Sequence, residues 1–336
     1  MASVPPNQLS KDELKQIIRP MVLAQGNNFI KELLREKGIK IGAGTKAAFG
    51  QAIEQAIDDG QLTQLMVEGW LLEVEGWGNQ HIYLCPPPKI SPGDILYALQ
   101  ASPHAALLQQ NISYAFPPAL TLSDVSVTAD RVSIIWNQSN NGWVRTPSQD
   151  RRDEIDGELY EFRAFRQRFE RKVVRYEWRF DSPFAALFNQ LPNEGTLHAD
   201  AKALVEADLG TLGLIAPPLG HIDIKRACDV LFTTDSARVQ SARLTADGAY
   251  ISMVANEGLV LSDVAAVRDV RTAVDVDDFR SADPICNFEK ARMPTLERDA
   301  IKIQGYGLDR RLRIWVQCVR EDVYRILDEM WRLNNI

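Results

Sequence analysis

The chain has 336 residues, of which 45% are hydrophobic and 25% are charged. This composition is that of a folded protein with a sizeable core, and it excludes a disordered tail, a collagen and a coiled coil. A formal net charge of −7 argues against a protein that coats nucleic acid nonspecifically, although it leaves room for a local basic surface.

The first expected elements are helices. The spacing of apolar residues predicts four of them, over 11–25, 27–37, 46–59 and 62–74. Ser10 and Glu13 fit a capping box at the start of the first helix. Gly38 is a natural stop for the second helix, and Gly60 ends the third. A short strand over 81–85 closes this part of the chain, which therefore reads as a helical N-terminal domain.

After Pro117 the apolar period changes from that of a helix to that of a strand. Two strands flank residues 129–131 and predict a hairpin, and the polar run 137–156 predicts a long loop. Two further strands are expected over 159–168 and 173–180. In the second of these, Val174, Tyr176 and Trp178 alternate with charged residues, so we expect one face inside and Arg175, Glu177 and Arg179 in water.

The second half mixes shorter segments. Strands are expected over 228–233, 239–244, 249–254, 300–304 and 312–319, and an amphipathic helix is expected over 321–333. The fold class is therefore α+β, with a helical domain over 10–85 and a mainly antiparallel, strand-rich body over 117–336. That body is either one domain or two domains that divide near 181–200.

Residues 29–57 carry a local resemblance. Two amphipathic helices are joined by a glycine-containing turn with lysines beside it, as in Leu33-Leu34, Gly38, Gly44, Lys46, Phe49, Ile53 and Ile57. This pattern over about 27–59 resembles the SAP module, and the resemblance implies DNA binding. The start of the second helix would offer backbone amides and a dipole to a phosphate. The expected contacts are Lys31, Lys40, Gly42, Gly44, Thr45 and Lys46. The alternatives are a hairpin with solvated lysines and a protein-docking module.

The layout of the whole chain carries a weaker likeness. A helical N-terminal domain followed by a β-domain with a basic strand, together with Ile134-Ile135-Trp136 and Asp181-Ser182-Pro183-Phe184, resembles the centromere protein N family. That family binds nucleosomes, and no residue role is carried over from it.

Residues 163–179 have a local net charge of +5, beside an acidic C-terminal part, 181–336, whose net charge is −6. Cations on a sheet could follow a phosphate backbone, with neighbouring aromatic rings stacking on exposed bases. The expected contacts are Arg163, Arg166, Arg168, Arg171, Lys172, Arg175 and Arg179. The alternative is a solvated sheet face in which arginines pair with glutamates across strands.

The sequence contains no established catalytic motif. The run Gly42-Ala43-Gly44-Thr45-Lys46 lacks the spacing of a phosphate-binding loop. The four histidines, His81, His104, His198 and His221, are too dispersed for a metal site. The acidic residues Asp275, Asp277, Asp278 and Asp283, with Lys290 nearby, are better explained as a solvated loop than as a magnesium site. No cofactor, metal site or catalytic residue is therefore expected.

Cysteine usage and hydropathy indicate the compartment. Cys85, Cys228, Cys286 and Cys318 are widely spaced, which is typical of reduced thiols. The N-terminal residues contain no basic region followed by an apolar run, so no secretory signal is expected. No apolar run is long enough to span a membrane. We therefore expect a cytoplasmic DNA-binding protein without a membrane partner. The alternatives are a protein-interaction subunit that uses the acidic C-terminal half with Trp70, Trp77 and Trp143, and a metal-dependent nuclease.

Overall fold

The computed structural model describes residues 10–12, 14–15, 27–67, 77–108, 117–190, 199–234, 236–246, 249–273 and 281–336. The chain forms two compact units, each built from more than one segment. Unit 1 comprises Met1–Leu71, Tyr114–Thr121 and Asn137–Lys172. Unit 2 comprises Leu72–Ser113, Leu122–Trp136 and Val173–Ile336.

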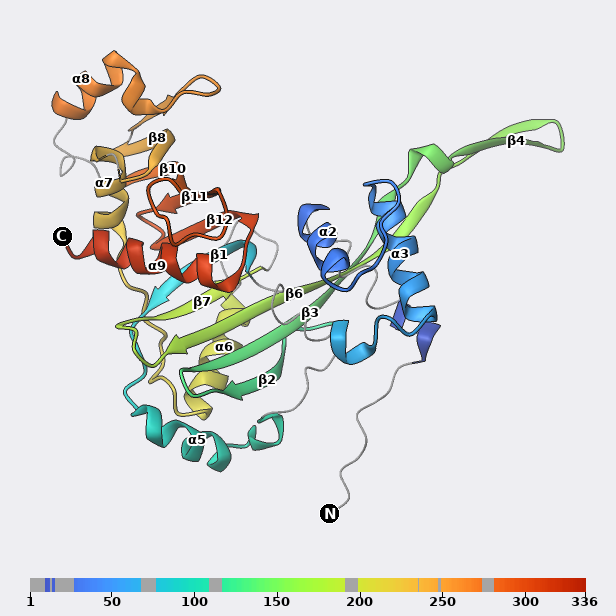
Figure 1. Cartoon of the computed structure of the whole chain (residues 1–336), viewed down its shortest axis with the longest axis horizontal. Helices are drawn as coiled ribbons and strands as arrows, with labels where there is room; N and C mark the ends of the chain where they lie inside the picture. Colours follow the sequence, from blue (N-terminus) through green and yellow to red (C-terminus); the bar gives the residue numbers. More distant parts are fainter. Residues whose placement is uncertain are drawn as a thin grey trace. The chain divides into compact units, whose positions relative to one another are not determined.

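The architecture is α+β, as the sequence predicts, with helices first and a large sheet after them (Figure 1). The main sheet has ten strands in the order β2-β3-β6-β7-β1-β12-β11-β10-β8-β9, and a separate sheet consists of β4 and β5. The strands are β1 (Gly78–Cys85), β2 (Thr121–Val127), β3 (Arg131–Arg145), β4 (Arg151–Ile155), β5 (Glu158–Phe162), β6 (Phe165–Arg179), β7 (Ala185–Asn189), β8 (Arg238–Ala246), β9 (Ala249–Val254), β10 (Ser281–Glu289), β11 (Ala300–Tyr306) and β12 (Arg311–Gln317). The α-helices are α2 (Asn27–Glu36), α3 (Lys46–Asp58), α5 (Pro92–Ala101), α6 (Ala199–Thr211), α7 (Lys225–Thr233), α8 (Ala265–Ala273) and α9 (Arg320–Asn334).

Helices α2 and α3 form the core of unit 1. Their apolar residues at helical spacing are buried together, among them Ile30, Leu34, Phe49 and Ile53. At the end of α2, Gly38 adopts a φ of 67°, a left-handed conformation that glycine reaches without steric cost. The amide of Ile39 then donates to the carbonyl of Leu34 at 2.9 Å, which closes the helix end. The predicted helix–loop–helix is therefore present at 27–58.

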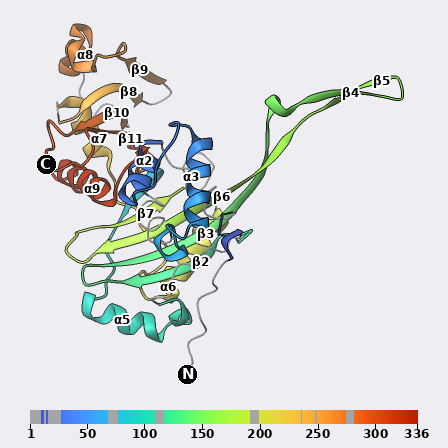
Figure 2. The same ribbon diagram turned by 45° about the vertical axis from the view of Figure 1, so that its right-hand side comes forward.

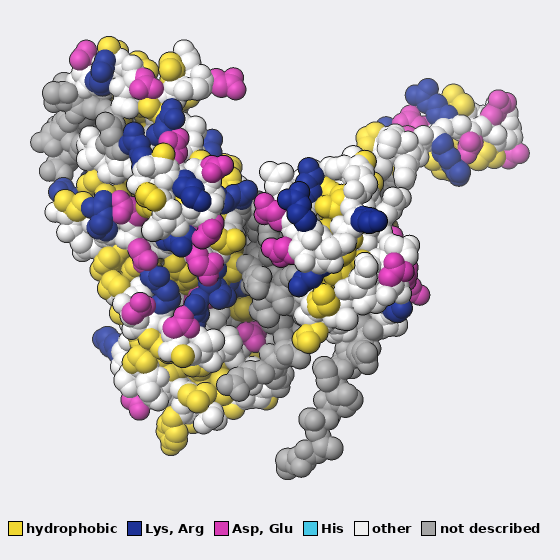
Figure 3. All heavy atoms as spheres, viewed as in Figure 1, with side chains coloured by type: hydrophobic (Ala, Val, Ile, Leu, Met, Phe, Trp, Pro, Cys, Tyr) yellow, Lys and Arg dark blue, Asp and Glu magenta, His cyan; other side chains and the backbone are white. Residues whose placement is uncertain are grey.

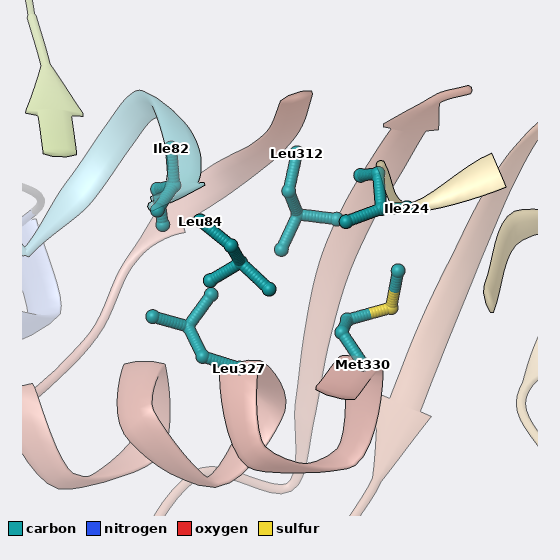
Figure 4. A pocket seen from close by; sticks show the side chains of 6 residues that line it. All are labelled: Ile82, Leu84, Ile224, Leu312, Leu327 and Met330. Carbon is teal, nitrogen blue, oxygen red and sulfur yellow. The ribbon is translucent and has the colours of Figure 1, made fainter. Parts of the chain in front are cut away.

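The core of unit 2 lies between one face of the sheet and helices α7 and α9. Strand residues that alternate along β1, β11 and β12 face these helices and are buried. Figure 4 shows a small pocket in this core, lined entirely by apolar side chains: Ile82, Leu84, Ile224, Leu312, Leu327 and Met330. These side chains contain no hydrogen-bond donor, and their only acceptor is the weak thioether sulfur of Met330, so the pocket does not suit a polar ligand.

Several predicted elements differ from those observed. Residues 137–156, predicted as a loop, continue strand β3 to Arg145 and supply β4. Residues 228–233, predicted as a strand, belong to helix α7, where Cys228, Leu231 and Phe232 are buried at helical spacing. A short apolar run fits either structure until its neighbours are known. The C-terminal helix is confirmed as α9. Most of the predicted helix 11–25 and the end of helix 62–74 lie outside the described residues.

The predicted domain boundaries, 10–85 and 117–336, also differ from the two units. Strand β1, expected to close the helical domain, belongs to unit 2 and pairs with both β7 and β12. Residues 137–172, expected in the strand-rich body, belong to unit 1 with the helices. Strands β3 and β6 each have one end in unit 1 and the other in unit 2. No described helix is both long and apolar enough to span a lipid bilayer.

Candidate nucleic-acid interface

The N-terminus of α3 has the local geometry of an anion site. Thr45 caps the helix: its backbone is extended, with φ −101° and ψ 152°, and its hydroxyl accepts a hydrogen bond from the amide of Ala48 at 3.3 Å. The first turn of α3 contains no acidic residue. Since the amides of a first helical turn lack partners within the helix and the dipole is positive there, this end of α3 attracts negative charge.

Lysines gather near the same end. A Cβ added at Gly44 would lie 3.4 Å from both Cε and Nζ of Lys31, so the Lys31 ammonium reaches from α2 to the loop before α3. Lys46 is the first residue of α3, and Lys40 and Gly42 are exposed in the same loop. The structure therefore brings Lys31, Gly44, Thr45 and Lys46 together, as the sequence predicts.

The predicted basic face of β6 is not a surface at its C-terminal end. Arg175 is 2% exposed and Glu177 is fully buried, whereas the sequence placed both in water. Arg179 forms a two-point ion pair with Asp328 of α9. The prediction was wrong because α9 covers this face of the sheet, so both faces of β6 are buried here. Arg175 is therefore part of the interior, whereas Arg179 keeps a 20% exposed side chain that is occupied by its ion pair with Asp328.

Glu177 is the acceptor at the centre of this network. Its Oε1 accepts a hydrogen bond from the Tyr324 hydroxyl at 2.8 Å and lies 3.4 Å from Nη1 of Arg131 and 4.0 Å from Nε of Arg320. Burial, and then the neighbouring Glu177 carboxylate, raise the pKa of Tyr324 well above its ordinary value. The guanidinium of Arg175 stacks on Trp77 at 4.3 Å. The cluster thus neutralises charge inside the protein.

The other predicted contacts of this stretch belong to unit 1. Arg163 is exposed and lies 3.4 Å from the carboxylate of Glu161, and Lys172 is half-buried. Arg166, Arg168 and Arg171 lie on the part of β6 whose side chains are outside the described set. The seven basic residues are therefore divided between the two units and do not form one described surface.

A second basic surface, which the sequence analysis did not identify, lies on the sheet face opposite α7 and α9. Along β12, Leu312 and Ile314 are buried in the core, whereas Arg311, Arg313 and Trp315 alternate with them and face the other way. The pairing of β11 with β12 sets Tyr306 beside Arg311 and Gln304 beside Arg313. The alternation of arginine with apolar residues at 311–315 could have indicated this basic surface from the sequence.

Guanidinium groups on this surface are stacked on aromatic rings. The Cζ atom of Arg311 lies 4.1 Å from the ring centroid of Tyr306, that of Arg313 lies 3.6 Å from Trp315, and that of Arg243 lies 4.0 Å from Tyr250. We name this surface the stacked-arginine face, and its members are Arg243, Tyr250, Lys302, Tyr306, Arg311, Arg313 and Trp315.

His81 lies at the border of the stacked-arginine face. Its Nδ1 is 3.0 Å from Nη1 of Arg311, and because a guanidinium only donates, Nδ1 is the acceptor and the imidazole is neutral. Burial, followed by the positive charges of Arg311 and Arg313, lowers the pKa of His81 to about 4. Burial likewise raises the pKa of the neighbouring Tyr83.

The alternative sites are not supported by the described geometry. Asp275, Asp277 and Asp278 lie outside the described residues, and the carboxylate of Asp283 accepts from the amide of Gly307 at 2.9 Å. No group of three or more potential metal ligands occurs among the described residues. Trp77, expected as an exposed docking residue, is fully buried, and Trp143 is 68% exposed. Trp70 is outside the described residues.

All four cysteines are buried and none forms a disulfide. Burial raises the pKa of each thiol, to about 12 for Cys286 and Cys318. Because the thiolate is the nucleophile and metal ligand, these cysteines are unreactive core residues.

No protein-family model matches the chain, and no curated protein matches it.

Proposed function

We propose that this protein is a DNA-binding protein rather than an enzyme, and that it contacts phosphates through the helix–loop–helix formed by α2 and α3. The observation that carries the proposal is the position of the Lys31 ammonium, which lies against Gly44 beside the capped N-terminus of α3. A phosphate at this position would meet backbone amides, the helix dipole and the charges of Lys31 and Lys46. None of these contacts is made to a base. Binding is therefore expected to be independent of the DNA sequence and to weaken as the salt concentration rises.

The proposal predicts that Lys40→Glu/Lys46→Glu weakens binding to duplex DNA by about tenfold or more and lowers the slope of log affinity against log salt by about 2. Both lysines are exposed, so their replacement leaves the core formed by Ile30, Phe49 and Ile53 intact. The measurement is fluorescence anisotropy with labelled double-stranded DNA, single-stranded DNA and RNA, each titrated across salt.

The matched control is Lys89→Glu/Arg226→Glu, which changes the net charge equally at two exposed positions of unit 2. We expect this control to bind duplex DNA like the wild type at moderate salt. Equal weakening by the two double variants would mean that net charge alone matters and that α2–α3 is not the contact site. Absence of duplex binding by the wild type at low salt would refute the proposal.

A second candidate function, protein association, is favoured by the β4–β5 ribbon. Figures 1 and 2 show β4 and β5 as a narrow two-stranded ribbon, and no other helix or strand among the described residues of unit 1 runs alongside it. The ribbon turns through Asp156 and Gly157, whose φ angles of 57° and 82° are those of a tight hairpin turn. Apolar side chains are exposed on it, and Figure 3 shows them mixed with basic and acidic ones. A lone hairpin of this kind is marginally stable in water without a partner.

One face of the ribbon is self-complementary. The register pairs Arg151 with Phe162, Asp153 with Tyr160 and Ile155 with Glu158, which places these six residues on one face. Arg151 lies at the base of the ribbon and Glu158 at its tip. If two copies stack face to face about a two-fold axis that runs across the strands, the base of each ribbon lies over the tip of the other. Arg151 of each copy then lies over Ile155 and diagonal to Glu158 of the other, and Phe162 lies over Glu158. We therefore propose a second copy of this chain as the partner.

The prediction is weak self-association in the micromolar range, because the ribbon offers only a small contact area. Arg151→Glu and Glu158→Arg should each abolish it by bringing like charges together, and an equimolar mixture of the two variants should restore it. Sedimentation equilibrium measures this directly, with Arg152→Glu, on the opposite face of the ribbon, as the control. A mixture that stays monomeric while the wild type associates would exclude this pairing.

A further inference from the structure

The stacked-arginine face has an excess of positive charge, although the C-terminal half of the sequence is acidic overall. On this side of the sheet lie Arg238, Arg243, Lys302, Arg311 and Arg313, against Asp283, Glu289 and Asp309. Arg238 is 3.2 Å from Glu289, and Arg311 is 2.9 Å from Asp309. The register also sets Asp283 directly across from Arg243. The five cations outnumber the three carboxylates, so the surface is net positive.

The aromatic rings hold the guanidinium groups in place. A stacked arginine has lost much of its side-chain freedom before a ligand arrives, so a contact to a phosphate costs less entropy. The rings themselves are also accessible: Trp315 is 39% exposed even with Arg313 stacked on it, and Tyr250 is 61% exposed. The surface thus offers both cations and π-faces to the same ligand.

The dimensions fit an extended strand. From β12 to β9 the sheet order contains four intervals, through β11, β10 and β8. At about 4.8 Å for each interval, the face extends about 19 Å across the strands. Trp315 of β12 lies at one side of this span, and the Arg243–Tyr250 pair of β8 and β9 lies at the other.

We infer that the stacked-arginine face is a binding site for single-stranded nucleic acid. Bases of one strand stack on the exposed rings, Trp315 at one side of the face and Tyr250 at the other, while the phosphates lie against Arg243, Lys302 and Arg313. A duplex fits less well, because its bases are already stacked on one another and cannot reach Trp315. An acidic peptide would match the charge but would make no use of the rings. The inference deepens the proposed function, since it adds a second, single-strand site in unit 2 to the phosphate site in unit 1.

The test is anisotropy with a labelled oligothymidylate, a labelled oligouridylate and a duplex of the same length. Trp315→Ala should weaken binding to both single strands by about tenfold and leave duplex binding unchanged, because stacking on one base is lost. Arg243→Glu/Lys302→Glu should weaken single-strand binding by a similar factor and reduce its salt dependence. The control is Tyr97→Ala, which removes a 77% exposed ring from α5 and should bind like the wild type. Far-ultraviolet circular dichroism checks that each variant is folded.

Each outcome decides between the two sites. If single strands bind but neither the Trp315 nor the Arg243/Lys302 variant weakens them, the inference is overturned while the α2–α3 proposal stands on its own duplex result. If these variants lose single-strand binding while Lys40→Glu/Lys46→Glu changes nothing, the inference stands and the α2–α3 proposal fails. If the wild type binds none of the three nucleic acids at low salt, both are overturned.

Discussion

Glu177→Ala is expected to lower the free energy of unfolding by about 3 kcal/mol, within the range for breaking a buried ion pair. Glu177 is fully buried and accepts from Tyr324, with Arg131 and Arg320 close by. Its removal leaves the Tyr324 hydroxyl without its acceptor and two guanidiniums without their shared carboxylate. Arg131 keeps its ion pair with Asp130, which holds the loss to the lower part of that range. Urea denaturation followed by tryptophan fluorescence measures the change.

Two further variants make the Glu177 experiment specific. Glu161→Ala removes an exposed carboxylate that pairs with Arg163, and such a surface pair contributes about 0–1 kcal/mol. Tyr324→Phe removes one hydrogen bond to Glu177 and should cost about 1.5–3 kcal/mol, because the acceptor is charged. Equal stability of Glu177→Ala and Glu161→Ala would show that the buried network does not stabilise unit 2.

The wild-type protein is expected to lose stability on the order of 3 kcal/mol through His81 alone as the pH falls from about 6.5 to about 4. The pKa of His81 is lowered from 6.5 to about 4 in the folded protein. Above pH 6.5 the imidazole is neutral in both states and has no effect. Between the two values the unfolded chain binds a proton that the folded protein excludes, so unfolding becomes easier. Below about pH 4 both states are protonated and no further loss occurs.

Replacing His81 with glutamine isolates this contribution. The glutamine amide does not titrate, and its oxygen can still accept from Arg311. Urea midpoints at about pH 7 and about pH 4.5 give the loss for each protein, and carboxylates contribute to both, so the difference belongs to His81. The variant should lose clearly less stability than the wild type. The same loss in both proteins would contradict the buried, neutral state of His81.

Local structure was readable from the sequence where the determining contacts are close in the chain. The apolar spacing in 27–59, the stop at Gly38 and the cap at Thr45 act within one or two helical turns, and α2 and α3 form where they were predicted. The juxtaposition of Lys31 with Gly44 follows from the short loop that joins these helices. The hairpin of β2 and β3 was predicted for the same reason, since its turn at Ala129-Asp130 is local.

The faces of the sheet were decided by tertiary structure. Alternation along β6 correctly separates Val174 and Tyr176 from Arg175 and Glu177, but it cannot say that α9, about 150 residues later in the sequence, covers the charged side. Along β12 the helices pack on the face that contains Leu312 and Ile314. Arg313 and Trp315 lie on the opposite face, which these helices do not cover. A two-residue period determines which side chains share a face, whereas burial of that face depends on which distant element packs on it. The sequence alone therefore identified the helix–loop–helix and the fold class, and only the three-dimensional arrangement showed which basic strand faces the interior.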